Sequence, residues 1–192
     1  MGYITRRSFL AGTLAFPAGL SLLRPAVGQE LQPTLECGAA TERQTEGPYF
    51  KPKSPNQRNL VPAGFSGETF QLVGFVLDTR CRPVEGALVD LWHADETGTY
   101  DNSGFRSRGH QYTDARGQFA FETVTPGLYP GRTRHFHLKV QAPGGPVLTT
   151  QLYFPNERGN RRDGLYDPSL EMAVTTAGPV RRGRFDFVVR TA

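Results

Sequence analysis

Long apolar runs are missing from this sequence of 192 residues, and no sustained helical repeat of apolar positions replaces them. The longest modestly apolar stretch, Phe9–Leu23, is short for a bilayer span and is interrupted by Pro17 and Gly19. Twenty-two glycines and fifteen prolines break long helices and favour short strands joined by turns. The composition therefore argues against a helical bundle and against a membrane-spanning protein.

A large excess of charge is also missing once the N-terminus is set apart. The whole sequence carries 22 basic and 18 acidic residues, but the first 28 residues hold three arginines and no acid. The remainder has 19 basic and 18 acidic residues, with no basic block or stripe. This balance argues against nucleic acid as the main partner.

The acid-free N-terminus has the pattern of an export signal. Arg6-Arg7 precedes the apolar stretch, and Ala26-Val27-Gly28 supplies a small-residue cleavage site. Paired arginines indicate the twin-arginine route, so residues 1–28 are predicted to be a signal peptide of a periplasmic or secreted protein. After cleavage we expect no stable membrane anchor. An uncleaved anchor is the alternative.

Cysteine is scarce, with only Cys37 and Cys81 in the chain. In an oxidising compartment an even count favours one disulfide, which predicts a Cys37–Cys81 bridge. Two buried thiols that are not bridged are the alternative. Because no CxxC spacing occurs, a cysteine-based metal site is not expected.

The rest of the sequence predicts an all-β fold, an antiparallel β-sandwich with long loops. Residues 29–66 contain few apolar positions and are expected to form an irregular arm, followed by a sandwich domain over residues 67–192. The connection from Phe154 to Arg184 is long and polar, which is typical of a functional loop. Short apolar runs bounded by turn signals predict strands at Thr69–Val76, Ala87–His93, Gln118–Val124, His135–Ala142, Thr149–Phe154 and Arg184–Val189.

Histidine is scarce too, with four in the chain, but two of them stand close together. In a strand, His135 and His137 point to one face while Phe136 points to the other. Two imidazoles on one face can converge on a metal ion, although such pairs also occur as solvated or hydrogen-bonded histidines. His93 and His110 lie in looser contexts, so a three-histidine zinc site is not supported.

An ordered set of segments resembles the intradiol ring-cleavage dioxygenases, the family of protocatechuate and catechol dioxygenases. Each segment is weak evidence alone, but their order and spacing together are specific. They cover most of the chain from residue 45 onward. The segments are Thr45–Phe50, Leu88–Ala94 with Tyr100, Tyr112–Gly117, Pro126–His137 and Thr150–Phe154.

The resemblance implies a ferric ion held by Tyr100, Tyr129, His135 and His137, with water or hydroxide completing the shell. A hard ferric ion favours anionic oxygen ligands, so the two phenols would bind as phenolates. Family precedent makes Tyr129 the ligand that leaves when substrate binds. The implied partners are a small aromatic diol and O2, and the implied reaction cleaves the ring between the two hydroxylated carbons to a muconate-type diacid.

The same resemblance gives roles to three further residues. Arg132 matches the active-site arginine of the family, which would stabilise negative charge on the ring, and Gln151 matches a glutamine near the ligand shell. Tyr49 is expected to line the substrate pocket. The Thr133-Arg134 pair departs from the Pro-Ala pair common in the family. No feature of the sequence indicates an oligomeric state.

Two other classes of protein remain open at this point. The pattern from Asp114 to Tyr129 also occurs in transthyretin-like sandwiches, which are binding modules without chemistry. A zinc- or copper-binding protein is the third reading. Retention of the tyrosine, histidine, arginine and glutamine set favours the dioxygenase.

Overall fold

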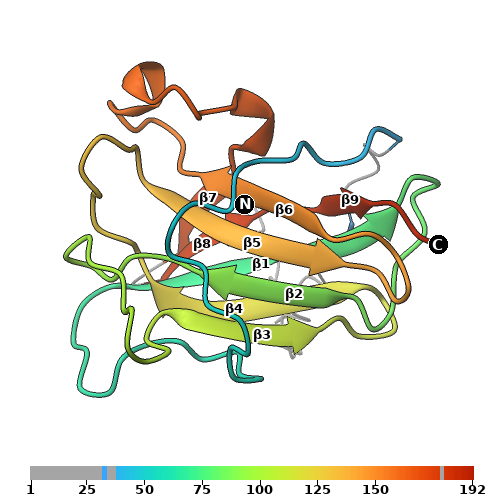
Figure 1. Cartoon of the computed structure of the whole chain (residues 1–192), viewed down its shortest axis with the longest axis horizontal. Coiled ribbons are helices and arrows are strands. Elements are labelled where there is room, and N and C mark those ends of the chain that lie inside the picture. Colours follow the sequence, from blue (N-terminus) through green and yellow to red (C-terminus); the bar gives the residue numbers. More distant parts are fainter. Residues whose placement is uncertain (1–31, 34–37, 178–179) are drawn as a thin grey trace, which may run out of the picture. The chain divides into compact units, whose positions relative to one another are not determined.

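A computed structural model describes residues 32–33, 38–177 and 180–192 (Figure 1). The predicted signal peptide of residues 1–28 lies outside the described residues, as does Cys37. Cys81, at a turn with φ of 62°, is not a free thiol. The Cys37–Cys81 pairing stays a prediction. No helix in the described ranges is both long enough and apolar enough to cross a bilayer.

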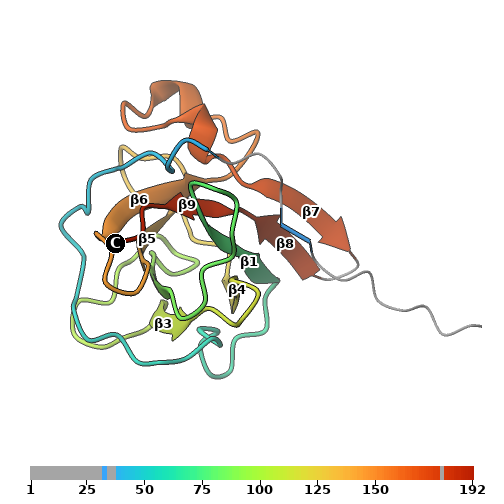
Figure 2. The ribbon, with the colours of Figure 1, turned by 90° about the vertical axis from the view of Figure 1, so that its right-hand side faces the viewer.

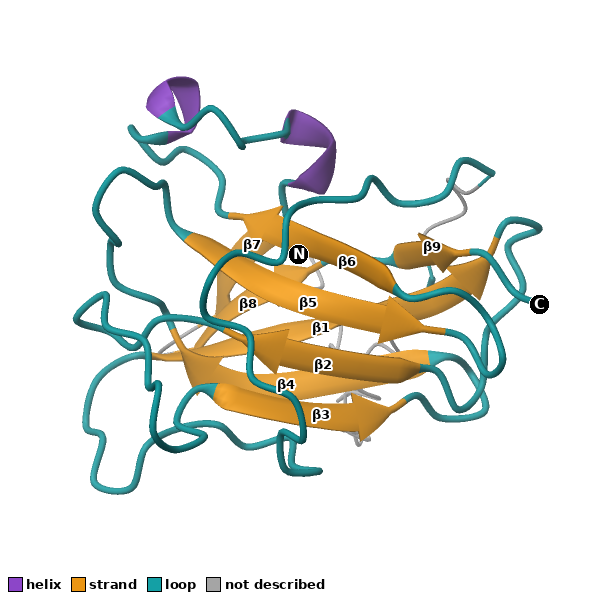
Figure 3. Ribbon diagram, in the orientation of Figure 1, coloured by secondary structure: helices purple, strands orange, loops and turns teal. Residues whose placement is uncertain are grey.

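The predicted all-β sandwich is confirmed (Figure 3). One sheet has the strand order β4-β1-β8-β7, with β9 also pairing with β1, and the other has the order β3-β2-β5-β6. Most strand pairs are antiparallel, but β1 pairs with β8 and with β9 in parallel. The strands are β1 Thr69–Asp78, β2 Leu88–Trp92, β3 Arg108–Tyr112, β4 Gln118–Val124, β5 His135–Gln141, β6 Leu148–Tyr153, β7 Ala173–Ala177, β8 Val180–Arg184 and β9 Phe187–Val189.

Alternation along β5 decides which face of the four-stranded sheet meets the core. Phe136, Leu138 and Val140 are fully buried among apolar residues of both sheets. The intervening His135, His137 and Lys139 must therefore face outward, away from the second sheet. The outer face of this sheet is where the polar chemistry of the chain collects.

The predicted single strand Arg184–Val189 is wrong. Its last three residues form β9, whereas Arg184 is only the final residue of β8, the rest of which was not predicted. Phe185 and Asp186 separate the two strands, and both strands pair with β1 in parallel. At this interruption the Asp186 carboxylate accepts the Phe75 N–H at 3.2 Å. The strands β3 and β7 escaped sequence analysis because both are edge strands with polar or small residues, which lack an apolar alternation.

The arm crosses the outer face of the four-stranded sheet and passes over β6, β5, β2 and β3 in turn (Figure 1). Backbone hydrogen bonds fix it at both ends of that crossing: the Gln44 N–H donates to the Thr149 carbonyl, and the His110 N–H donates to the Pro55 carbonyl. Residues 38–66 contain no helix and no strand beyond isolated bridges. The arm therefore covers the outward-facing side chains of this sheet.

The predicted loop from Phe154 to Arg184 is shorter than expected, because β7 and β8 lie within that range. The remaining connection between β6 and β7 holds the only helical turns in the described ranges. These are the 3-10 helices η1 Asn160–Arg162 and η2 Pro168–Leu170, and Figure 2 shows them beyond the edge strand β6. The Asp167 carboxylate caps η2 by accepting the Ser169 N–H at 2.8 Å.

Candidate active site

Strand register places four side chains in one row across the outer face of the four-stranded sheet. Trp92 on β2 pairs with Arg108 on β3 and with His137 on β5, and His137 pairs in turn with Gln151 on β6. The indole of Trp92 stacks on the His137 imidazole with ring centroids 5.1 Å apart and an interplanar angle of 9°. This stacking fixes the plane of the His137 ring.

The two imidazoles of β5 meet through their Nε2 atoms, which lie 3.1 Å apart. His135 donates from Nδ1 to the Thr133 carbonyl oxygen at 2.6 Å. Because a carbonyl oxygen can only accept, Nε2 of a neutral His135 keeps its lone pair and directs it toward His137. A hydrogen bond from the second ring nitrogen to a carbonyl oxygen is how proteins commonly orient metal-binding histidines.

Burial keeps both rings neutral. It lowers the pKa of His135 to about 4, with Arg132 adding to the effect, and it lowers the pKa of His137 well below its usual range. Neutral imidazoles are the form that binds metal ions.

Tyr100 joins this pair from the loop after β2. Its hydroxyl lies 3.4 Å from Nε2 of His135, and its side chain is buried. The loop is shaped by Asp95, whose carboxylate accepts the N–H groups of Thr97 and Thr99, each at 2.9 Å. Burial raises the pKa of Tyr100, so the phenol keeps its proton unless a cation lies beside it.

Tyr129 and Tyr49 complete an aromatic cluster with Tyr100. The Tyr49 ring stacks on Tyr100 with centroids 4.3 Å apart, and its hydroxyl lies 2.9 Å from the hydroxyl of Tyr129. The Tyr129 ring meets Tyr100 edge to face at 5.9 Å. Among the described residues, Tyr129 makes no hydrogen bond to either imidazole; its partner is Tyr49.

Arg132 and Gln151 are brought together beside the histidines. The Arg132 guanidinium donates from Nη2 to the Gln151 side-chain oxygen at 2.7 Å and from Nε to Asp163 at 2.8 Å. Gln151 donates its own amide to the Thr45 carbonyl at 3.0 Å, which ties the arm to the site. The seven residues that sequence analysis assigned to the site therefore lie in one region of the fold.

The donor set fits a metal ion with nitrogen and oxygen ligands. Two neutral imidazole nitrogens face each other at 3.1 Å, and a phenol oxygen lies 3.4 Å from one of them. No group of three or more His, Cys, Asp or Glu side chains in the described ranges could hold a metal. Tyrosine oxygens are thus the donors that could complete the shell, and anionic oxygen suits a hard, highly charged cation.

The remaining two histidines are engaged elsewhere. His93 is buried and hydrogen-bonds through Nδ1 to the Ala94 carbonyl and through Nε2 to the Thr123 hydroxyl, both at 2.7 Å. His110 contacts the Ser54 hydroxyl through Nδ1 at 3.1 Å. Neither ring joins the His135–His137 pair.

Burial of His93 makes the metal-free protein sensitive to acid. Burial lowers the pKa of His93 to about 4, from 6.5 in an unfolded chain, so the unfolded chain binds the proton first as the pH falls. The contribution of neutral His93 to the free energy of unfolding is present in full above pH 6.5. It falls by about 3 kcal/mol as the pH drops toward 4. In urea titrations, His93→Gln should flatten the dependence of the free energy of unfolding on pH. Above pH 7, the plot of this free energy against pH should run parallel to that of the wild type. An unchanged slope between pH 6.5 and 4 would contradict the assignment.

Gly47 allows the arm to approach the site closely. Its φ is 72°, and a Cβ built on it would lie 3.2 Å from Cε1 of His137. A side chain at this position would crowd the imidazole and shift it from its place against Trp92. The motif Thr45–Phe50 thus has a steric reason for its glycine.

We expect Gly47→Ala to weaken metal binding and activity about tenfold or more, because displacing a ligand ring costs at least as much as losing a supporting contact. Gly64→Ala is the matched control, since Gly64 lies on the same arm with φ of 76° and nothing within 4 Å of its built Cβ. Both variants should lose about 1–2 kcal/mol of stability from backbone strain. Equal metal affinity in the two variants would show that the His137 contact is unimportant.

Sequence analysis missed Asp163, which accepts hydrogen bonds from Arg132 and from the Thr133 N–H. Its only signal was its place in the long polar connection after Phe154. Trp92 lies within the motif Leu88–Ala94, but its stacking on His137 depends on strand register, which spacing does not give.

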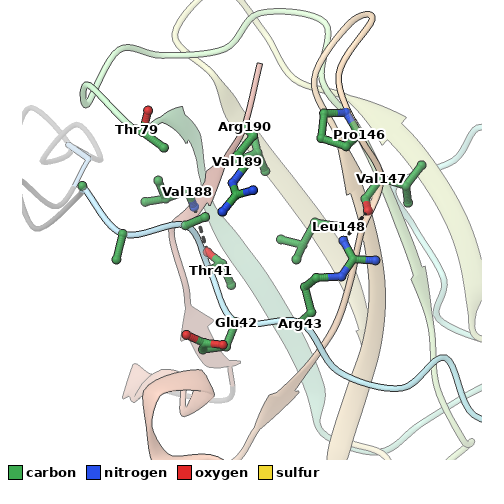
Figure 4. Close-up of a pocket in the computed structure, with 13 residues that line it drawn as sticks. Thr41, Glu42, Arg43, Thr79, Pro146, Val147, Leu148, Val188, Val189 and Arg190 are labelled. Carbon is green, nitrogen blue, oxygen red and sulfur yellow. Dashed lines mark hydrogen bonds between the residues drawn. The ribbon is translucent and has the colours of Figure 1, made fainter. Parts of the chain in front are cut away.

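A pocket of about 570 Å³ lies away from this region (Figure 4). It is bounded by residues 38–43, by the start of β6 and by β9, and Arg43 spans it to donate to the Val147 carbonyl at 2.7 Å. Its lining contains no histidine, tyrosine or tryptophan and shares no residue with the predicted site. It therefore lies apart from the histidines and tyrosines of the candidate site.

Known proteins with similar sequences and folds include a family of dioxygenases. The sequence profile of a family described as "Dioxygenase" matches residues 45–174, a range that contains all seven assigned site residues. A hydroxyquinol 1,2-dioxygenase of Nocardioides simplex is 29% identical over 194 residues, which cover 81% of this chain and 66% of the relative. The beta chain of a protocatechuate 3,4-dioxygenase of Burkholderia cepacia is 31% identical over 153 residues, or 65% of each chain.

The chain spans 57–66% of the length of four hydroxyquinol 1,2-dioxygenases that it matches. It covers the whole of one solved structure, the dioxygenase domain of a dioxygenase carbohydrate-binding protein fusion from Streptomyces sp. SirexAA-E. That structure has 54% sequence identity and a TM-score of 0.78 over 80% of this chain. The matched profile, the shared fold and the ordered motifs agree, and the chain belongs to the intradiol ring-cleavage dioxygenase family.

Proposed function

We propose that the protein is a non-haem iron(III) dioxygenase that uses O2 to cleave a catechol-type ring between its two hydroxylated carbons. The observation that carries the proposal is the pair of facing imidazoles, 3.1 Å apart at Nε2, beside the buried Tyr100 phenol. Relatives named for hydroxyquinol and catechol support the substrate class. The product expected from catechol is a muconate-type diacid.

Tyr100, Tyr129, His135 and His137 would hold the iron. When bound, the ferric ion supplies the electron-accepting centre that activates the diolate toward O2. Two phenolates offset part of the ferric charge, and the imidazoles add none. The ordinary phenol pKa of about 10 leaves tyrosine protonated at neutral pH, so metal uptake by this set releases protons.

The two phenols differ in how easily they can make room for a diol. Tyr100 is buried, whereas Tyr129 is partly exposed and hydrogen-bonds to Tyr49. Tyr129 is therefore the phenol suited to move aside and take up a substrate proton at its oxygen. Tyr49 then serves as a neighbouring hydroxyl that can hold the protonated Tyr129 side chain.

Arg132 and Gln151 act on the charge of the substrate. The guanidinium is mostly buried, with 16% of its side chain exposed, and Asp163 and Gln151 restrain its plane. A fixed cation in a partly water-excluded site stabilises negative charge that develops on the ring. Gln151 donates to the Thr45 carbonyl, so it also anchors the arm above the site.

The test is an aerobic substrate screen of the iron-loaded protein with catechol, protocatechuate, hydroxyquinol, and chlorinated and alkylated catechols. Oxygen uptake and the absorbance of the diacid are measured without added reductant. Consumption of at least one diol with equal uptake of O2 supports the proposal. Metal analysis runs beside it, because ferric phenolate absorbs in the visible whereas a zinc protein is colourless.

We further propose that the protein is exported by the twin-arginine route, on the strength of Arg6-Arg7 and the acid-free segment that follows. Changing Arg6→Lys together with Arg7→Lys should retain the precursor inside the cell. Fractionation followed by immunoblotting measures this. Unchanged amounts of periplasmic or secreted protein would rule the route out.

A further inference from the structure

The carboxylate of Asp163 lies in the connection between β6 and β7, directly after η1, with only 2% of its side chain exposed. A buried carboxylate is costly unless it is paired and hydrogen-bonded. Burial alone raises the pKa of Asp163, but hydrogen bonds from the N–H groups of Leu165 and Thr133 and from Arg132 outweigh it and lower the pKa. The group is therefore an anion held in place on both of its oxygens.

One oxygen of Asp163 contacts two parts of the segment that leads into β5. Oδ2 accepts from Nε of Arg132 at 2.8 Å and from the Thr133 N–H at 2.9 Å. The other oxygen, Oδ1, accepts the Leu165 N–H at 2.9 Å, which fixes the carboxylate to its own loop. Asp163 thus joins the loop to the residues that precede His135.

The two contacts on Oδ2 act on different components of the site. Because Nε of Arg132 is held by Asp163 and Nη2 is held by Gln151 at 2.7 Å, the planar guanidinium cannot rotate about its last bonds. The Thr133 N–H is held by Asp163, and the carbonyl of the same residue, in the next peptide unit, accepts from Nδ1 of His135 at 2.6 Å. A single carboxylate therefore contacts both the arginine and the backbone of the residue whose carbonyl orients a predicted ligand.

We propose that Asp163 is a positioning residue of the site, which orients the Arg132 guanidinium and the backbone at Thr133. This inference rests on the proposed function. Asp163 acts through Arg132 and His135 and needs no contact with substrate. The same loop offers a matched comparison in Glu157, which pairs with Nε of Arg134 at the same distance of 2.8 Å.

The experiment compares Asp163→Asn with Glu157→Gln, each of which removes one carboxylate charge from the same loop. Asp163→Asn should lower kcat/KM for the best diol about 10- to 100-fold, as the loss of contacts that support a site typically does. Anaerobic titration should show weaker binding of the same diol. Glu157→Gln should stay within about twofold of wild type in both measurements.

A double variant separates positioning from general stability. If Asp163 works through Arg132, adding Asp163→Asn to Arg132→Ala should cost much less than Asp163→Asn costs alone. Asp163→Glu keeps the charge and should retain more activity than Asp163→Asn. Additive losses, or equal losses in Asp163→Asn and Glu157→Gln, would overturn the proposal. Failure of both Asp163 variants to fold, with Glu157→Gln folded, would overturn it in favour of a purely structural role.

The outcomes distinguish this inference from the function on which it rests. A wild-type protein that turns over none of the diols overturns both. A wild-type protein that is active, with Asp163→Asn equally active and binding diol equally well, overturns the role of Asp163 and leaves the proposed function standing.

Discussion

His137→Ala should abolish iron binding and dioxygenase activity together, and His135→Ala should do the same. Each change removes one of four proposed protein ligands, and His93 and His110 are hydrogen-bonded elsewhere, so neither imidazole has a nearby substitute. Loss of a supporting contact around a metal already costs 10- to 100-fold, so activity should fall by more than about 100-fold. Iron stoichiometry and the visible absorbance measure the loss directly.

His93→Ala is the matched control for these two variants. His93 is also a buried imidazole next to β5, but its nitrogens contact Ala94 and Thr123. The control variant should lose stability and keep its iron and its colour. Full iron and colour in both His135→Ala and His137→Ala would mean that the metal site lies elsewhere in the chain.

Arg132→Ala should lower the rate of diol cleavage by about 10²- to 10³-fold while iron stays bound, because one electrostatic stabiliser is lost. Arg134→Ala is the control: its guanidinium also pairs with a carboxylate of the long loop, and its side chain is similarly buried, at 21% exposed. Steady-state kinetics with iron quantified in each preparation measure both. Equal losses in the two variants, or loss of iron from Arg132→Ala, would contradict an electrostatic role for Arg132.

Local pattern was enough to predict most of the strands and the outward face of β5. Strands at Thr69, Leu88, Gln118, His135 and Leu148 have apolar alternation and flanking turn residues, and each was expected within two residues of its start. The missed strands β3 and β7 lie at sheet edges, where one face meets solvent or the arm and an apolar pattern is not required. The strand β8, of which only Arg184 was predicted, consists mostly of arginine and glycine and so has no apolar pattern either. The interruption between β8 and β9 lies where Asp186 contacts Phe75, which is distant in sequence.

The site residues likewise divide into those that a local pattern predicts and those that it does not. The alternation of residues 135–137 predicts the shared face of the histidines, whereas Tyr100, Tyr129, Arg132 and Gln151 were assigned through resemblance to a family. Asp163 and the contact of Gly47 with His137 arise only when the arm and the long loop pack on the sheet. These contacts are non-local, so no spacing in the sequence encodes them.

The position of the site follows from the burial of the inner face. Apolar residues of β5 fill the space between the sheets, so the outer face is the one left for polar side chains, and the arm shields it from water. Metal ligands on a rigid strand are held more accurately than ligands on loops. The phenols, by contrast, come from loops, which suits a role in which one of them moves.

Cleavage between the hydroxylated carbons is the central claim, and the product formed from catechol under 18O2 tests it most directly. Mass spectrometry of the iron-loaded wild-type reaction should find a dicarboxylic muconate that carries two labelled oxygen atoms, formed without reductant. A yellow semialdehyde would place the cleavage outside the diol and would contradict the account.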